Sequence, residues 1–402
     1  MDRRVVITGL GPVSSIGVGV EAFGAALRAG RSGISEITAF DASGFPHRRA
    51  GEVPGFEPAA LLERLDVDVW GRTCLFAAAA ARLAVRDSGI DPEHLAAARS
   101  GSSFGTTGGE ARVVEDLTEQ WVAHGFDSLA PDTVRKVPAS RISVAVNAEL
   151  GLTGEVMTLS TACSASNYAL GYAYDLVASG EQDYMVAGGA DSVTRWVHAG
   201  FYRLGAVTEH ACAPFDRDRS GILTGEGGAA LFVESLESAR ERGAHIYAEV
   251  LGYGLNCDAE HMVAPNADSI AECMRLAHRN AGITAADVDY ICAHGTGTPA
   301  NDLVEAGAVT QVFGDRLPPI SSIKSMLGHT MGAASGFGAI ASVLGIDGGF
   351  IPPTINFTTP DPALGDIDPV PNLPRQARLD VVQNNGFAFG GNNAITILGR
   401  VA

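Results

Sequence analysis

Short apolar runs rich in β-branched residues alternate along this chain with longer stretches of helical periodicity. The apolar runs predict strands at residues 5–8, 156–159, 184–187, 229–233, 246–254, 288–292, 379–383 and 394–398. The helical patterns cover residues 20–29, 69–88, 164–179, 269–281, 303–312 and 332–344. This alternation is typical of α/β layers, and strands that are apolar throughout indicate a sheet covered on both faces.

The chain is long enough for two or three domain-sized units. It has 402 residues, of which 46% are hydrophobic, 18% are charged and 49 are glycine, a composition that favours tightly packed layers over disorder. A polar break at residues 238–244 follows a predicted strand. We therefore divide the chain into an N-terminal half, residues 1–245, and a C-terminal half, residues 246–402. The proline-rich stretch 351–374 predicts a long ordered loop.

Charge and composition argue against several classes of protein. The net charge of −18 argues against nucleic-acid binding. No run of 18 apolar residues predicts a membrane span, and Gly9, Gly11 and Pro12 interrupt the N-terminal apolar stretch too early for a signal peptide. The six cysteines have no CxxC spacing, so we expect neither a disulfide framework nor a zinc site, and a reducing cytoplasm fits best.

Cys163 is the strongest candidate for chemistry. It lies in the segment Ser160–Ser166, between the apolar run 156–159 and the helical pattern 164–179. A thiol at this strand-to-helix turn meets the free N–H groups and partial positive charge of a helix N-terminus, which favour the nucleophilic thiolate. Such a cysteine can carry a covalent intermediate. A lone cysteine is more often a small buried hydrophobe, so the assignment depends on motifs further along the chain.

Three downstream motifs supply candidate partners for Cys163. His294 follows the predicted strand 288–292 and opens a His-Gly-Thr-Gly-Thr run, where a side chain can point into a cavity. Lys324 and His329 precede the helix 332–344, and an ammonium there would favour neutral imidazole. Glycines beside Phe389 predict a turn with N–H groups free to face a ligand. Taken singly, these motifs also fit a core histidine, a surface lysine with a capping histidine, and an ordinary glycine-rich turn.

Taken together and in this order, the motifs resemble those of the β-ketoacyl synthase family, the condensing enzymes of fatty-acid and polyketide assembly. The resemblance runs nearly end to end and includes residues 5–12, 160–166, 214–221, 225–228, 294–298, 324–329, 351–356 and 385–392. It implies an α/β, thiolase-like, five-layered αβαβα fold built from two similar halves. It also implies an acyltransferase, a 3-oxoacyl-[acyl-carrier-protein] synthase of the elongating type in a type II polyketide or fatty-acid pathway.

The resemblance assigns the chemistry to a Cys-His-His site. Cys163 would attack an acyl thioester and hold the acyl chain. His294 and His329 would donate hydrogen bonds to the malonyl thioester carbonyl and stabilise the enolate left when carbon dioxide departs. His294 would also position water or the carboxylate. The enolate would then attack the acyl group in a Claisen condensation, with the N–H groups of Cys163 and Phe389 as the oxyanion hole.

Other positions take supporting roles by the same resemblance. Lys324 would support His329 electrostatically, and Phe389 would swing aside as a gate for the acyl chain. Thr296 and Thr298 would bind the pantetheine arm. The site would hold no metal and no cofactor of its own, because the phosphopantetheine arrives on the acyl carrier protein. That carrier is acidic, so this acidic chain needs local basic contacts, and we predict Arg135 and Lys136, with Arg72 and Arg203 behind them.

The sequence departs from the common family pattern at two single positions and in the nucleophile region Cys163-Ser-Ala-Ser-Asn-Tyr168, and it leaves several alternatives open. Gly338 stands where fatty-acid members usually carry Glu, and Ser220 where Asp is common. Because glutamate is absent at position 338, a lysine–glutamate pair or a bound cation at this position is in doubt. Gly338 also favours a polyketide member of the family. A dimer is expected, either a homodimer or a heterodimer with a chain-length-factor subunit, with no nucleic acid and no membrane as partners.

Three rival functions remain to be weighed. A non-condensing chain-length-factor subunit of the same fold usually lacks the nucleophilic cysteine, which is present here. An initiating synthase uses Cys, His and Asn, whereas Gly328-His-Thr330 favours the elongating type. A thiolase needs a second cysteine near the C-terminus, and no cysteine follows Cys292.

Overall fold

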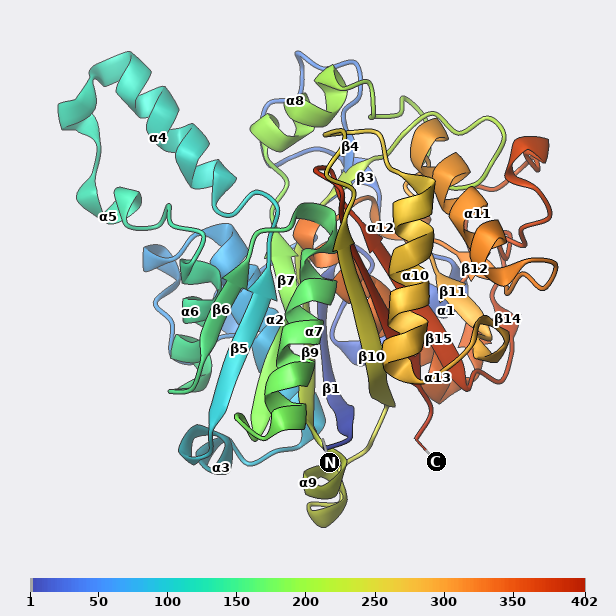
Figure 1. The fold of residues 1–402 in the computed structure, drawn as a ribbon. Helices are drawn as coiled ribbons and strands as arrows, with labels where there is room; N and C mark the ends of the chain where they lie inside the picture. Colours follow the sequence, from blue (N-terminus) through green and yellow to red (C-terminus); the bar gives the residue numbers. More distant parts are fainter. Residues whose placement is uncertain (1–2, 402) are drawn as a thin grey trace.

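One mixed sheet of eleven strands organises the computed structural model, which describes residues 3–401 (Figure 1). Its N-terminal part has the order β6-β5-β7-β9-β1 and its C-terminal part the order β12-β11-β15-β16-β10. The N-terminal strands are β1 (Val5–Ser14), β5 (Ser100–Gly105), β6 (Val156–Leu159), β7 (Tyr184–Asp191) and β9 (Gly227–Ser235). The C-terminal strands are β10 (Ala248–Cys257), β11 (Tyr290–Cys292), β12 (Ile320–Ser321), β15 (Val381–Phe387) and β16 (Asn392–Gly399).

The two parts of the sheet have the same topology. When the five strands of each part are numbered in chain order, both follow the sequence 3-2-4-5-1. The antiparallel pair β1–β10 joins the two parts. The predicted division at residues 245 and 246 falls between helix α9 (Leu236–Glu241) and β10. The chain therefore contains an internal structural repeat.

Helices form three layers around the two parts of the sheet. The central layer is α7 (Ala165–Ser179) and α13 (Ala334–Gly348), which each contact strands of both parts. The outer layers are α2 (Arg72–Ser88) with α6 (Arg141–Leu150), and α10 (Ala267–Ala281) with α11 (Pro299–Phe313). Figure 1 shows α10 covering the C-terminal strands on the outside. The predicted five-layered α/β fold is confirmed.

The central helix α13 is apolar because it is enclosed on all sides. The segment Met331–Gly348 is long and apolar enough to cross a membrane by composition, but 89% of it is buried inside the protein. Helices that are hydrophobic all round are typical of the core of a large protein. Small residues let the central helices approach the sheet closely. At Gly105, for example, an added Cβ would lie 2.3 Å from the carbonyl carbon of Ala165 on α7.

The observed elements match most of the predicted ones. The strand Val156–Leu159 and the helix α1 (Val20–Ala29) have the predicted bounds, and the others begin or end a few residues away. The sequence analysis missed β5, because its residues Ser100-Gly-Ser-Ser-Phe-Gly105 are small and lack β-branching, although all six are buried. The proline-rich stretch forms a loop with one short 3₁₀ turn, Pro362–Leu364.

An arm extends from the body between β5 and α6. It consists of α4 (Ala111–His124), the turn Phe126–Ser128 and α5 (Pro131–Val134), and Figure 1 shows it at the upper left, away from the sheet. The remaining helices are α3 (Pro92–Ala97), α8 (Arg195–Arg203) and α12 (Lys324–Leu327). The remaining short strands are β2 (Gly17–Val18), β3 (Ser35–Glu36), β4 (Arg49–Gly51), β8 (Thr224–Gly225), β13 (Phe350–Ile351) and β14 (Arg375–Gln376).

Candidate active site

Cys163 lies at the strand-to-helix turn that the sequence predicts. The chain leaves β6, passes through the 3₁₀ turn Ala162–Ser164 and enters α7. Ala162 has a φ of 52°, in the left-handed region that non-glycine residues rarely adopt. Such strain is stored where surrounding contacts fix an unusual backbone, often at functional sites. The turn places the Cys163 side chain in a cavity while leaving it almost fully buried.

The ionisation of Cys163 differs from the expectation. Burial raises the pKa of its thiol to about 11, and the charge of Asp191 acts in the same direction. The ammonium of Lys324 and the N–H groups of Phe389 and Cys163 itself lower the pKa, but by less. The N–H groups therefore favour the thiolate, as predicted, but the loss of water on burial outweighs them, and the pKa of the thiol stays above its usual value. The same two N–H groups lie at the sulfur, where they are close to the oxygen of an acyl group bound to it.

His329 has a fixed orientation and a fixed tautomer. Its backbone N–H donates to Leu223 O at 2.6 Å, and its carbonyl accepts from the N–H of Gly225 at 2.8 Å. The N–H of Met331 donates to the ring Nδ1 at 3.1 Å. The neutral ring must then carry its proton on Nε2. Burial, reinforced by the charge of Lys324, holds the pKa of His329 well below its usual range, so the ring is a neutral hydrogen-bond donor.

His294 lies beside His329 at the end of β11. The ring centroids are 5.7 Å apart and the rings are nearly perpendicular, at 82°. Burial, reinforced by the charge of Lys324, holds the pKa of His294 well below its usual range. Within residues 3–401 its Nδ1 is buried and has no hydrogen-bond partner. A ring nitrogen without a protein partner is available to a water molecule or to a substrate group.

Lys324 holds the His294 peptide and acts on both rings. Its Nζ donates to the carbonyl oxygen of His294. The side chain is buried, and its charge lowers the pKa of both His294 and His329. The predicted electrostatic effect on His329 is therefore present, but the hydrogen bond goes to His294. Burial lowers the pKa of Lys324 itself, and the carboxylate of Glu305 is the first of the groups that oppose this.

Two buried carboxylates at the site escaped the sequence analysis. Glu305, on α11, accepts the N–H of His294 at 2.8 Å and that of Gly295 at 2.7 Å. Asp191, at the end of β7, accepts four hydrogen bonds, including one of 2.6 Å from the N–H of Gly332. Burial raises the pKa of Asp191 to about 6. The position of Glu305 on the helix that follows the His-Gly-Thr-Gly-Thr run could have indicated its role. The sequence around Asp191 contains no comparable signal.

The three predicted chemical side chains share one cavity. It has a volume of about 250 Å³, and Cys163, His294 and His329 all contribute to its wall. Phe389 also lines it, with its ring 5.5 Å from the ring of Phe201. The remaining lining residues are Leu204, Gly205, Ala206, Ile222, Asp258, His261, Met262, Val263, Ala264, Pro265, Thr296, Thr298, Pro299, Ala300, Asn301, Phe387, Ala388 and Gly391.

The threonines predicted to bind pantetheine lie on the wall of the same cavity. The hydroxyls of Thr296 and Thr298 are 2.8 Å apart and hydrogen-bonded to each other. Asp302 holds the loop between them by accepting the N–H groups of Thr296 and Gly297. The site therefore presents a pair of hydroxyls on a rigid loop, beside the two histidine rings.

The positions that depart from the family pattern have local explanations. An added Cβ at Gly338 would lie 2.4 Å from Oδ1 of Asn384, so this backbone has no room for a glutamate there. The carboxylate that acts on Lys324 is Glu305 instead. Ser220 forms a hydrogen bond of 2.7 Å with the hydroxyl of Thr208. Across residues 3–401, no group of three or more potential metal ligands is present.

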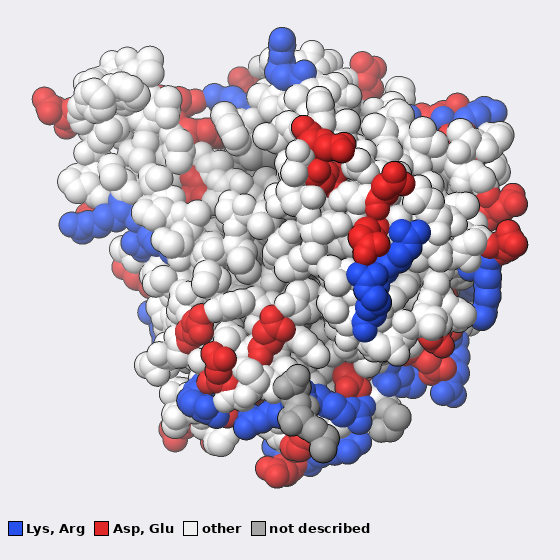
Figure 2. Space-filling view, viewed as in Figure 1, with Lys and Arg blue, Asp and Glu red and all other residues white. Residues whose placement is uncertain are grey.

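The two basic residues predicted to contact a carrier protein lie away from the cavity. Arg135, beside α5, is exposed and pairs with Asp132 at 2.9 Å, while Nζ of Lys136 donates to the carbonyl of Asp68. Neither lines the cavity. Arg203 is exposed at the end of α8, next to the lining residue Leu204. On the face in Figure 2, basic side chains gather mainly along the lower edge and the right side.

Known proteins show the same architecture. A sequence model of the β-ketoacyl synthase N-terminal domain matches residues 2–239, and one of the C-terminal domain matches residues 247–358. The chain belongs to the β-ketoacyl synthase family. It is an acyltransferase of the 3-oxoacyl-[acyl-carrier-protein] synthase type, and the family resemblance seen in the sequence is confirmed.

Curated relatives match over nearly their whole length. The chain is 39% identical to 3-oxoacyl-[acyl-carrier-protein] synthase 2 of Coxiella burnetii, over 99% of both chains. It is 37% identical to nodulation protein E of Rhizobium meliloti, over 100% of both chains.

Two solved structures are also similar over their full length. One is the ishigamide ketosynthase/chain length factor, at 50% identity and a TM-score of 0.98. The other is a type II polyketide acyl carrier protein in complex with its ketosynthase bound to the hexaketide, at 31% identity and a TM-score of 0.92.

Proposed function

We propose that this chain is the condensing subunit of a type II polyketide system, and that Cys163, His294 and His329 carry out the decarboxylative condensation. The observation that carries this proposal is the shared cavity: one thiol and two neutral imidazoles line it, and two backbone N–H groups lie at the sulfur. This set matches what a two-stage acyl transfer requires, namely a nucleophile, donors for an enolate and an oxyanion hole.

In the first stage, the sulfur of Cys163 attacks the carbonyl of an acyl thioester on the carrier protein. A bond forms between sulfur and the acyl carbon, the carrier thiol leaves, and the thiol proton of Cys163 passes to the leaving sulfur. The N–H groups of Cys163 and Phe389 stabilise the tetrahedral oxyanion, and one such donor contributes about 3–4 kcal/mol. Because burial raises the pKa of the thiol, attack depends on Lys324 and these N–H groups at the moment of reaction.

In the second stage, malonyl-carrier protein loses carbon dioxide. The electrons of the broken carbon–carbon bond form an enolate, and Nε2–H of His329 is a ready donor to its oxygen because Met331 occupies Nδ1. His294 is the second donor, and its unpartnered Nδ1 supports the role of holding a water molecule or the departing carboxylate. The enolate carbon then attacks the acyl group on Cys163, which releases β-ketoacyl-carrier protein and leaves Cys163 as a thiolate. A proton taken up from solvent restores the thiol.

The carrier protein brings the remaining parts. Its phosphopantetheine arm would lie along Thr296 and Thr298, and the protein would need no cofactor of its own. Phe389 would act as the gate, since its ring rests on Phe201 and borders the sulfur. Arg203, Arg135 and Lys136 are the proposed basic contacts, and a cytoplasmic location fits this partner.

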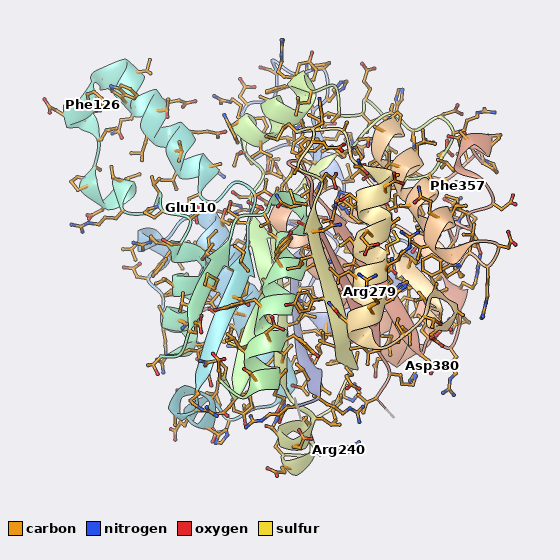
Figure 3. The ribbon with its side chains drawn as sticks, viewed as in Figure 1. Glu110, Phe126, Arg240, Arg279, Phe357 and Asp380 are labelled. Atoms are coloured by element: carbon orange, nitrogen blue, oxygen red, sulfur yellow. The ribbon has the colours of Figure 1, made fainter. Side chains whose placement is uncertain are left out.

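We propose that the functional form is a dimer with a chain-length-factor subunit. The edge strand β6 pairs only with β5 among the described strands, so its other edge is free to pair with a second chain. Exposed apolar side chains lie on β6, on the adjacent helix α6 and on the arm: Val156, Val144, Trp121, Val122 and Phe126. Figure 3 shows Phe126 at the far end of the arm, clear of the body. The 50% identical ketosynthase/chain length factor supports a heterodimer.

A non-condensing partner subunit is the second candidate function, and the site argues against it. Such a subunit has no need of a thiol and two imidazoles around one cavity. The deciding experiment incubates the protein, alone and with a candidate chain-length-factor subunit, with octanoyl- and malonyl-carrier protein. Release of carbon dioxide together with a β-ketoacyl product supports the proposal. Product formation that requires the partner supports the heterodimer, and no product under either condition refutes the condensing role.

A further inference from the structure

A row of buried polar side chains leads from the outer helix α10 to the active site. His278, on α10, forms a hydrogen bond of 2.7 Å through Nε2 to Oε1 of Gln383 on β15. Nε2 of Gln383 donates to Oδ1 of Asn385 at 2.8 Å, and Nδ2 of Asn385 donates to Oε1 of Glu305 at 2.9 Å. All four side chains are at most 5% exposed. The row thus continues without a break from α10 to a carboxylate beside His294.

The hydrogen bonds in this row all run in one direction. Gln383 uses its NH₂ group on Asn385, so its oxygen faces the imidazole and must be an acceptor. Nε2 of His278 therefore carries a proton, in the neutral ring as well as in the cation. Each member fixes the orientation of the next, and the last donor of the row, Asn385, faces Glu305.

The row ends at the peptide that supports the catalytic ring. Glu305 accepts the N–H of His294, while Lys324 donates to the carbonyl of the same residue. Glu305 and Lys324 thus fix the backbone of His294 through its N–H group and its carbonyl group. A change in the position or charge of Glu305 must therefore act on both His294 and Lys324.

We propose that His278 and Gln383 are positioning residues of the condensation reaction, because they keep the amide of Asn385 turned so that its NH₂ group faces Glu305. The proposal rests on the role of His294 proposed above. An asparagine amide is nearly symmetrical in shape, so packing alone does not choose between its two orientations. Without the donor on Gln383, Oδ1 of Asn385 loses the hydrogen bond that fixes the amide, and the NH₂ group can rotate away from the carboxylate, which weakens its hydrogen bond to Glu305.

Loss of that hydrogen bond has a defined electrostatic consequence. Burial raises the pKa of Glu305, and the donor on Asn385 is the foremost of the groups that lower it. The other groups that face the carboxylate include the N–H groups of His294 and Gly295 and the side-chain amide of Asn301, which donates at 3.5 Å. The charge of Asp302 raises its pKa, and the ammonium of Lys324 and the thiol of Cys292 also act on it. Removing the donor therefore raises the pKa of Glu305 further, and the carboxylate takes up a proton at a higher pH.

The sign of the effect on activity follows from this shift. The active form needs ionised Glu305 as the counter-charge to Lys324, so activity falls on the acid side as Glu305 becomes protonated. A higher pKa moves this acid limb toward neutral pH. Protonation of His278 does not break the row, because the cation still carries a proton on Nε2. Burial also lowers the pKa of His278, and among charged groups only Asp287 opposes this.

The test compares the pH dependence of kcat for condensation of octanoyl- and malonyl-carrier protein, using the complete protein with its partner if activity requires one. Gln383→Leu removes the middle of the row and His278→Leu its outer end, while His278→Gln retains an N–H donor. We expect Gln383→Leu to lower kcat about tenfold at pH 7, to leave the KM for malonyl-carrier protein within about twofold, and to move the acid limb upward. His278→Leu should do the same to a smaller extent, and His278→Gln should restore most of the activity.

A double variant and a matched control separate positioning from general stability. The double variant His278→Leu/Gln383→Leu should be no worse than Gln383→Leu alone, because the residues act in series. Asn147→Leu removes another buried hydrogen bond, 2.7 Å from Ser102 to Asn147, well outside the cavity. It should lower Tm and leave the acid limb in place.

Each result decides the proposal. An unshifted acid limb in Gln383→Leu, or additive losses in the double variant, would show that the row is only structural. If Gln383→Leu does not fold, the same comparison between His278→Leu and His278→Gln decides the question. A wild-type protein without condensing activity would refute the proposed function and this inference together. If the wild-type protein catalyses condensation but the acid limb of the variants is not shifted, this inference alone would be refuted.

Discussion

Two turns of the same shape begin the two central helices, one in each half of the molecule. In the N-terminal half, Ala162 has a φ of 52° and Cys163 follows it at the start of α7. In the C-terminal half, Met331 also has a φ of 52° and Gly332 follows it at the start of α13. A threonine precedes each pair, Thr161 and Thr330. By this internal repeat, Gly332 is the structural counterpart of the nucleophile.

The difference between the two turns shows how a duplicated backbone takes two roles. Cys163 faces the cavity with its thiol. At Gly332 an added Cβ would lie 2.5 Å from Cα of Thr106 and 2.8 Å from Oδ2 of Asp191, so no side chain fits. Its N–H donates to Asp191 instead, while its neighbour Met331 donates to His329. One turn presents the proposed nucleophile, and the other holds the ring of His329, which we propose serves the second stage.

The largest expected effect comes from removing the thiol that distinguishes the first turn. Cys163→Ala should reduce condensation by roughly a thousandfold or more, because no covalent intermediate can form. The α7 backbone should keep its conformation, so Tm should change little. Cys74→Ala, a buried cysteine on α2, is the matched control and should keep its activity. Product formation by Cys163→Ala at the wild-type rate would remove the first turn from the mechanism.

A side chain at Gly332 in the second turn should destabilise the protein by overpacking. Gly332→Ala places a methyl group against Thr106 and Asp191, and overpacking of this kind costs about 1–3 kcal/mol of stability. We expect a lower Tm and a loss of activity, since the support of His329 moves. Gly307→Ala, within α11 where an added Cβ meets nothing within 4 Å, should instead stabilise the protein by about 0.5–1 kcal/mol. Equal Tm values for the two variants would contradict the close packing of the second turn.

The charge of Lys324 acts on Cys163 at the first turn and on His329 beside the second. Removing this charge should therefore change the pKa of the Cys163 thiol. Its ammonium lowers the pKa of the thiol, so Lys324→Met should raise that pKa. At pH 8, below the pKa of about 11, less thiolate is then present and alkylation by iodoacetamide slows. Each unit of upward shift lowers the rate about tenfold. Mass spectrometry of the Cys163 peptide across a pH series measures this, and a rate profile unchanged from wild type would refute the link.

The smallest expected effect lies at the surface, where two of the proposed carrier-protein contacts can be compared. Arg203 adjoins the cavity residue Leu204, whereas Arg135 lies beside α5 and pairs with Asp132. Arg203→Glu should raise the KM for the carrier protein about two- to fivefold, and Arg135→Glu should raise it less. Both variants should leave turnover of small thioester substrates unchanged. A larger effect at Arg135 would move the docking surface to the arm, and no effect at either position would remove both assignments.

The sequence was sufficient to identify candidate site residues where the local structural pattern and the residue type agree. A cysteine between an apolar strand and a helix, and a histidine at a strand end, carry their own structural context, and Cys163, His294 and His329 indeed share a cavity. The alternating periodicities predicted α/β layers, and the fold of two similar halves followed from the family resemblance. What the sequence could not supply were effects of long-range packing. The pKa of Cys163 depends on burial among residues distant in the chain, and Glu305 and Asp191 acquire their roles from backbone groups that only the fold brings near.

Peptide mass spectrometry of the protein incubated with octanoyl-carrier protein tests the central claim most directly. The account predicts one octanoyl group, attached to the peptide that contains Cys163, and predicts that it disappears as β-ketoacyl-carrier protein forms after malonyl-carrier protein is added. An octanoyl group on one of the five other cysteines, or an acyl group on Cys163 that malonyl-carrier protein does not remove, would contradict the account.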